Sequence, residues 1–239
     1  MSSGCEFHFS YSATDAKRLL FFLLGFEVLL VSAYILTHIV APDIRSWVHL
    51  PTFFNIDREA TIPNWFSFIQ LFAMGLLLTM QAPSAKQLRN ALGILGCGFL
   101  FLSMDEAAAI HERLSSDAIR ALNLTWLKEI EYLAWMVPYV CIGAIGLVTG
   151  YRSALFAWRN FHRESVLVVT GCVLFVIGGM ALDAYSRFRF TVAPDEHFLL
   201  TVAAEEMFEM VGASIMFYGF MLLGIGIQTQ ATVQRPVRN

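Results

Sequence analysis

Six long hydrophobic runs, separated by short polar segments, dominate the chain. Each run is close to the ~20 residues with which an α-helix crosses the hydrocarbon core of a bilayer. Pro63 precedes the second run and Pro83 follows it, positions at which proline is tolerated at a helix start or ends a helix. The pattern predicts an all-α integral membrane protein, a bundle of six transmembrane helices. The predicted spans are 17–40, 64–80, 89–110, 132–151, 166–185 and 198–227.

The composition supports this fold class and excludes others. Hydrophobic residues make up 57% of the chain and charged residues 15%, outside the usual range of soluble domains. A net charge of −3 without a basic tract argues against a nucleic-acid partner. Three of the four cysteines lie inside hydrophobic runs, so we expect no disulfide framework. Because no internal repeat is visible, residues 1–239 are expected to form a single domain in the lipid bilayer.

Basic residues set the predicted orientation, since cytoplasmic loops carry an excess of Lys and Arg. With both termini cytoplasmic, nine basic residues fall on the cytoplasmic side and seven on the other. Glu6, Asp15 and Glu164 are then the only acidic residues on the cytoplasmic side, and the remaining sixteen lie in the spans or on the outer side. This predicts a bacterial cytoplasmic (inner) membrane protein whose acidic half faces the periplasm.

Carboxylates inside the hydrophobic runs are the main functional signal. Ionisable groups at membrane depth are costly and commonly mark a functional site. They are concentrated towards the predicted outer ends of the third and sixth spans, where His111 supplies a nearby imidazole. We predict a metal-ligand set of Asp105, Glu106, His111, Glu205, Glu206 and Glu209. Residues predicted to line this site or to form its second layer are Glu27, His38, Gln70, Glu112 and Asp183.

This ligand set is chemically suited to divalent metals. Oxygen-rich ligation favours Mg²⁺, Ca²⁺ or Mn²⁺, and carboxylates with one or two imidazoles favour iron, manganese or zinc. The set has enough ligands for one metal ion or for two that share bridging acids. The Glu-x-x-His pair of di-iron bundles is absent because Glu106 and His111 are five residues apart. Without a cation, the same acids would have to share protons.

Three functions fit this pattern. The first is a membrane metalloenzyme, either a hydrolase or an oxidoreductase, that acts on a lipid-like or hydrophobic substrate. The second is an accessory or interaction subunit that docks another membrane protein or forms a homo-oligomer. The third is a cation- or proton-coupled transporter, which is disfavoured because the inner halves of the spans are nearly wholly apolar. The sequence does not assign a catalytic residue.

Overall fold

The computed structural model describes residues 11–40, 50–56, 58, 60–111, 113, 117, 121, 134–189 and 196–233, and every regular element among them is helical. The elements are α1 (Ala13–Ile35), η1 (Leu36–Val40), α2 (Leu50–Phe53), α3 (Ile62–Gln81), η3 (Ala82–Ser84), α4 (Arg89–Ala108), α7 (Met136–Asn160), α8 (His162–Val176), η5 (Ile177–Leu182), α9 (Asp183–Arg189) and α10 (Glu196–Val233). The short segments η1 and η5 are π-helical, and η3 is a 3₁₀ turn.

Among the described residues, six helical stretches are long and apolar enough to cross a membrane, which agrees with the predicted number of spans. They are Ala13–His38, Ile62–Ser84, Arg89–Ala108, Met136–Asn160, His162–Arg189 and His197–Gln230. The fourth differs most from its predicted bounds, which end before Arg152. The helix continues to Asn160 and carries Arg159 in its last turn, where a positive charge interacts favourably with the helix dipole.

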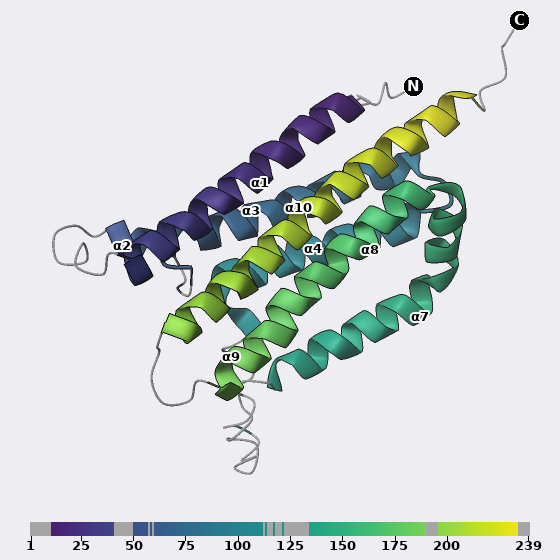
Figure 1. Cartoon of the computed structure of the whole chain (residues 1–239). Coiled ribbons are helices and arrows are strands. Elements are labelled where there is room, and N and C mark those ends of the chain that lie inside the picture. The colour runs from purple at the N-terminus through teal and green to yellow at the C-terminus, as the bar shows by residue number, and fades with distance from the viewer. Residues whose placement is uncertain are drawn as a thin grey trace, which may run out of the picture.

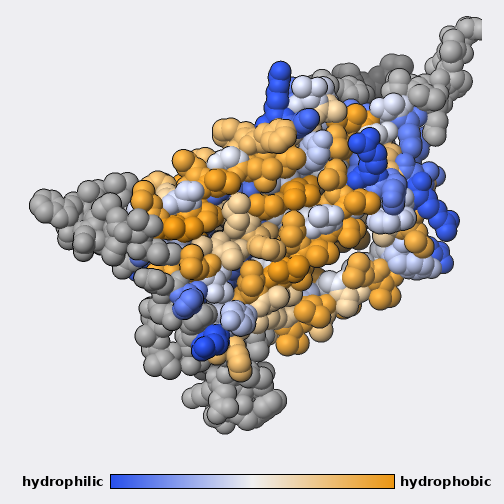
Figure 2. All heavy atoms as spheres, viewed as in Figure 1, coloured by the Kyte–Doolittle hydropathy of each residue, from blue (hydrophilic) through white to orange (hydrophobic). Residues whose placement is uncertain are grey.

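The helices form a bundle with two chemically different ends. The start of α1 and the end of α10 lie at the same end, which we call the terminal end (Figure 1). We call the opposite end, where Glu106, Asp183 and Glu205 lie, the acidic end. Figure 2 shows hydrophobic surface over the middle of the bundle and hydrophilic side chains gathered towards its ends. This distribution fits an integral membrane protein.

Helix α10 is the central element. In its most apolar stretch 61% of the residues are buried, whereas none are buried in the corresponding stretch of α7. Helix α10 packs against α1, α3 and α8. The largest hydrophobic cluster occupies the half of the bundle nearer the terminal end, and its buried residues include Leu71, Met74, Leu78, Met216 and Phe220.

Glycines bring α8 and η5 unusually close to α10. A Cβ atom added at Gly171 would lie 2.5 Å from the Gly212 carbonyl oxygen, and one added at Gly178 would lie 2.7 Å from the Glu205 carbonyl oxygen. Small residues allow such backbone contact between membrane helices. The close approach of η5 places Asp183, the first residue of α9, beside the acidic residues of α10.

The end of α4 is shaped by a left-handed residue. Ala109 has φ 46° and ψ 47°, and its amide donates to the Asp105 carbonyl oxygen. This conformation costs about 1–2 kcal/mol for a residue with a Cβ atom. It reverses the chain so that His111 folds back onto the last turn of α4.

Candidate functional site at the acidic end

Asp105 is the best-anchored carboxylate at the acidic end. Its side chain is buried and accepts three hydrogen bonds. The His111 amide donates to Oδ1 at 2.8 Å, His111 Nδ1 lies 3.0 Å from Oδ2, and the Tyr139 hydroxyl donates to Oδ2 at 2.6 Å. An ionised carboxylate is the natural acceptor for this set, because it carries no proton of its own. The two bonds from His111 hold the chain just after α4 against its last turn, and the bond from Tyr139 joins the end of α4 to the start of α7.

Aromatic rings fix the His111 imidazole in place. The Trp135 ring lies over it with 4.7 Å between centroids, and the Tyr139 ring meets it edge-on at 6.3 Å. The carboxylate on Nδ1 selects the tautomer in which this nitrogen carries the hydrogen, so the lone pair resides on Nε2. The arrangement therefore presents an oriented imidazole of the kind that transfers protons in general acid–base catalysis.

A second group of acids lies where α4, η5 and α10 meet. Glu106 Oε1 accepts a hydrogen bond of 3.1 Å from the Asn64 amide of α3. The carboxylate of Glu209 lies against Gly179, where an added Cβ would be 3.1 Å from Glu209 Oε1. Glu106, Glu205 and Asp183 are the neighbouring carboxyl groups whose charges interact with that of Glu209. Four acids from three elements thus approach one another.

Two further contacts hold members of this group. Arg187 Nε lies 2.6 Å from Asp183 Oδ1, one helical turn away, which is the ordinary ion pair that their spacing indicates. The Ser186 hydroxyl donates to Glu205 Oε2 at 3.4 Å. Arg187 is 45% exposed and Asp183 is 7% exposed, so the positive charge lies at the rim of the acid group.

Glu27 and Gln70, both predicted to line the site, form a separate centre deeper in the bundle. Glu27 is completely buried, and its Oε1 accepts from Gln70 Nε2 at 2.9 Å and from the Ser214 hydroxyl at 2.6 Å. Gln70 Nε2 also donates to the Ser214 oxygen at 2.8 Å. This centre joins α1, α3 and α10.

Three predicted residues remain: His38, Glu206 and Glu112. His38 Nδ1 contacts the Thr37 hydroxyl at 2.9 Å and the Tyr34 carbonyl oxygen at 3.1 Å, both on its own helix. Glu206 is partly buried on α10. Glu112 lies outside the described residues. Five of the six predicted ligands therefore divide between two groups: Asp105 pairs with His111, and Glu106, Glu205 and Glu209 lie together with Asp183.

Among the described residues, no group of three or more His, Cys, Asp or Glu side chains has the arrangement that could hold a metal ion. The predicted ligand set is therefore not arranged as a preformed metal centre in this part of the chain. The chemistry visible at the acidic end is an oriented imidazole next to a group of close carboxyl groups.

Several residues that build these groups were not predicted as site residues. Tyr139 supplies the shortest hydrogen bond to Asp105, and Ser214 supplies the shortest one to Glu27. Tyr139 is a polar ring in the first turns of a hydrophobic run, next to Trp135, and resembles an ordinary interfacial aromatic residue. Ser214 follows a Gly-Ala pair and resembles a small packing residue. Only the three-dimensional contacts distinguish their roles.

A family model described as "Domain of unknown function (DUF8692)" matches residues 20–223, which is most of the chain. The chain belongs to this family. The matched DUF8692 region includes Glu27, Asp105, His111 and all the acids of the second group. No curated protein and no solved structure was found to match the chain.

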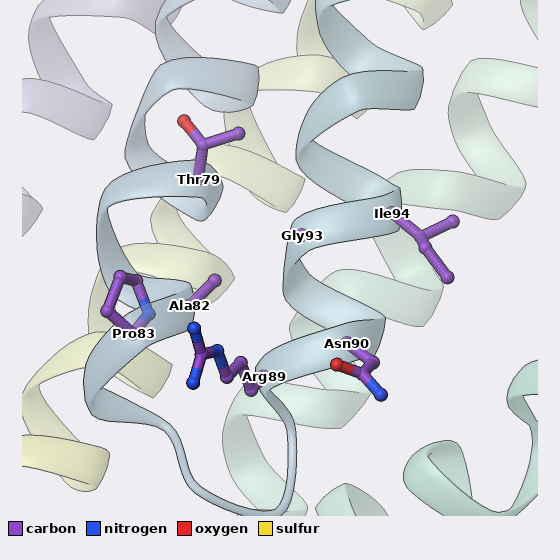
Figure 3. A pocket seen from close by; sticks show the side chains of 7 residues that line it. All are labelled: Thr79, Ala82, Pro83, Arg89, Asn90, Gly93 and Ile94. Atoms are coloured by element: carbon purple, nitrogen blue, oxygen red, sulfur yellow. The ribbon is translucent and has the colours of Figure 1, made fainter.

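A groove at the terminal end of this DUF8692 chain lies away from both acid groups. Its volume is about 520 Å³, and it opens between α3 and α4. Figure 3 shows the Arg89 side chain extending from α4 into the space between the two helices, towards Pro83 and Ala82. None of the predicted site residues lines this groove. The other lining residues are Thr79, Asn90, Gly93 and Ile94.

Proposed function

We propose that this protein is a membrane-embedded enzyme that performs acid–base chemistry on a lipid-like substrate at the acidic end. His111 is the proton-transferring residue, and Asp105 orients it. The observation that carries this proposal is the set of three hydrogen bonds that hold Asp105 against His111 and Tyr139. A carboxylate on Nδ1 fixes the tautomer and stabilises the imidazolium that forms when Nε2 accepts a proton.

The position of α7 supports a substrate that reaches the site from the bilayer. Tyr139 ties the Asp105–His111 pair to the first turns of α7, a span in which no residue is buried. Its apolar side chains are widely exposed, with Ile142 at 63% and Leu147 at 73%. The pair therefore borders apolar surface that would contact acyl chains. A substrate with a polar head and an apolar tail matches both environments.

The reaction class follows from what an oriented imidazole does. In a hydrolase, His111 Nε2 would take a proton from water as the water attacks the substrate and return it to the leaving group. In an oxidoreductase, it would supply or remove the proton that accompanies electron transfer to an external acceptor. The close carboxyl groups favour the hydrolase, because they provide polar surroundings for water beside an apolar wall.

We further propose that the second acid group binds a divalent metal ion, with Glu106, Glu205, Glu206 and Glu209 as ligands. Iron, manganese, zinc and calcium suit these oxygen ligands. Glu106 and Glu205 lie close enough to Glu209 for their charges to interact. When ionised, these carboxyl groups repel one another, and a divalent cation would offset that repulsion. Because these side chains are not prearranged as ligands, binding would reorient them.

The proposed location is a bacterial inner membrane, with the acidic end in the periplasm. The excess of basic residues in the predicted cytoplasmic segments supports this orientation. A coupled transporter is disfavoured because buried apolar residues, Met74 and Leu78 on α3 and Phe220 on α10, separate Gln70 from the polar Gln81 at the terminal end. No continuous polar path therefore joins the two ends along these helices.

The second candidate function is that of an interaction subunit. It is favoured by α7, in which no residue is buried. Both flanks of α7 are apolar and exposed, a surface that another membrane protein or a second copy of this chain could cover as well as lipid. In that case the Asp105–Tyr139 bond would position α7 for docking rather than for catalysis. The tests below distinguish these two functions.

The enzyme proposal is tested with the purified full-length protein in nanodiscs made from a bacterial total lipid extract. Lipids are profiled by mass spectrometry over time for the wild type, His111→Gln, Asp105→Asn and the control His162→Gln. His162 is exposed at the terminal end of α8. We expect a time-dependent product in the wild type and control, reduced about 10²–10⁴-fold in His111→Gln because general acid–base catalysis is lost. A lipid profile that stays constant in the wild type, or equal turnover in all four proteins, would refute the enzyme proposal and favour the interaction subunit.

The metal proposal has its own experiment. Protein purified without chelator is examined by elemental analysis beside a Glu205→Gln/Glu209→Gln double variant and a Glu164→Gln control in the first turn of α8. A stoichiometric metal that is lost only in the double variant is expected. Absence of metal from the wild type would refute the metal proposal. The acid–base proposal would not be affected.

A further inference from the structure

We infer that Glu27, Gln70 and Ser67 form a site for one small monovalent cation, with Na⁺ as the best fit, buried between α1, α3 and α10. This site is separate from the acidic end and has no part in the proposed reaction. The reason to suspect it is that a fully buried acid, the amide hydrogen-bonded to it and a hydroxyl one helical turn before that amide each carry a buried oxygen atom without a hydrogen-bond partner among the described residues.

The Glu27 carboxyl group is only half satisfied. Oε1 accepts two hydrogen bonds, from Gln70 and from Ser214. Oε2 is buried and has no hydrogen-bond partner among the described residues. The same is true of Gln70 Oε1 and of the Ser67 hydroxyl, which lies one helical turn before Gln70 on α3. All three atoms can donate electron pairs to a cation.

The walls of the centre supply no positive charge. Leu23, Leu30, Phe66 and Met210 pack around it as a hydrophobic cluster. Among the described residues, the Glu27 side chain is hydrogen-bonded by Gln70 and Ser214 and by no basic side chain. An isolated ionised carboxylate in such surroundings is strongly destabilised by loss of hydration. A cation would offset that cost and engage the free oxygen atoms at the same time.

The charge and the ligand types select the ion. One carboxylate balances one positive charge, so a divalent ion would leave a net charge in an apolar interior. Carboxylate, amide carbonyl and hydroxyl oxygens are hard ligands that suit hard cations. Water could bridge the same atoms, but it would leave the Glu27 charge unbalanced. A proton on Oε2 would balance the charge but would leave the Ser67 hydroxyl unpartnered.

The position of the site agrees with access from the acidic end. Gln70 is eight residues into α3, about 12 Å from its start at 1.5 Å per residue. Beyond it, towards the terminal end, Leu71, Met74 and Leu78 are buried. The ion would therefore lock three helices together near the middle of the bundle without crossing it.

The test measures thermal unfolding of the full-length protein in nanodiscs with NaCl, KCl or choline chloride at equal ionic strength. Na⁺ is expected to raise Tm in proportion to the logarithm of its concentration, by about 5–10 °C at a hundredfold excess over its Kd. Glu27→Gln is expected to lose this dependence and, in choline chloride, to unfold above the wild type, because its buried charge is gone. The control Glu164→Gln, in the first turn of α8, should keep the wild-type response.

Ser214→Ala provides a second variant should Glu27→Gln fail to fold. Loss of its hydrogen bond to Glu27 should raise the Na⁺ concentration for half-maximal stabilisation about tenfold. Equal Tm values in the three salts would overturn the inference. So would an Na⁺ response that persists in Glu27→Gln.

Discussion

Replacing Gly171 with alanine should destabilise the bundle more than the small size of the added methyl group suggests. The added Cβ would lie 2.5 Å from the Gly212 carbonyl oxygen and 2.6 Å from the Met216 amide nitrogen. Both atoms belong to the backbone of α10, which cannot swing aside as a side chain can. Relief requires α8 and α10 to separate, at an overpacking cost of about 1–3 kcal/mol. Because both close contacts are with backbone, we expect a value near the upper limit.

The assay is thermal unfolding of wild type and variant in one detergent, with Gly143→Ala as the matched control. Gly143 lies on α7, and a Cβ there meets no atom within 4 Å. Alanine is favoured over glycine inside helices by up to ~1 kcal/mol, so the control should be slightly stabilised. At 2–4 °C per kcal/mol for a chain of about this size, Gly171→Ala should lower Tm by roughly 6–12 °C. Equal Tm shifts in the two variants would refute the close contact between α8 and α10.

Three further predictions concern individual hydrogen bonds. Ser12→Ala removes the cap of α1, where the Asp15 amide donates to the Ser12 hydroxyl, and should lower the free energy of unfolding by about 0.5–2 kcal/mol, measured by denaturant titration. Tyr139→Phe removes the 2.6 Å hydrogen bond to Asp105 and should weaken the attachment of α7 to α4. We expect faster hydrogen exchange of the backbone amides in the first turns of α7. Unchanged exchange would contradict this prediction. Burial raises the pKa of Tyr11 above its usual value of 10.0, against a smaller opposing effect of its hydrogen bond with Gln81. The stability that neutral Tyr11 provides should be complete below pH 10 and should decline as the pH rises through the pKa of the folded state. The Tm of Tyr11→Phe should therefore fall less than the Tm of the wild type as the pH is raised above 10.

Part of the candidate site could be predicted because the relevant residue types are rare inside hydrophobic runs. Glu27, Glu106 and Glu209 stand out among apolar neighbours, and their desolvation cost makes a specific environment necessary. The sequence also places Asp183 and Arg187 one turn apart, and the structure confirms their ion pair. Position along a helix thus gives the depth at which each acid is expected to lie.

The tertiary structure was needed to show which acids lie together. The sequence pattern of a helix gives the depth of each residue along the bundle, but it does not show which neighbouring helix the residue faces. Asp105 and Glu106 are adjacent in sequence, yet one faces His111 and Tyr139 and the other Asn64. The left-handed conformation of Ala109 returns His111 to Asp105. It could not be predicted from the sequence, because alanine does not favour this conformation. One predicted ligand set therefore became two groups of residues.

The sequence by itself determined that the chain forms six long apolar helices, because hydrophobic runs of this length and the prolines at their ends depend only on local composition and spacing. Only the tertiary structure decided which helices touch. Gly171, Gly178 and Gly212 permit backbone contact between α8, η5 and α10, while α7 stays outside the core although it is as hydrophobic as α3 and α4. Packing depends on the shape of both surfaces, which no single run of sequence contains.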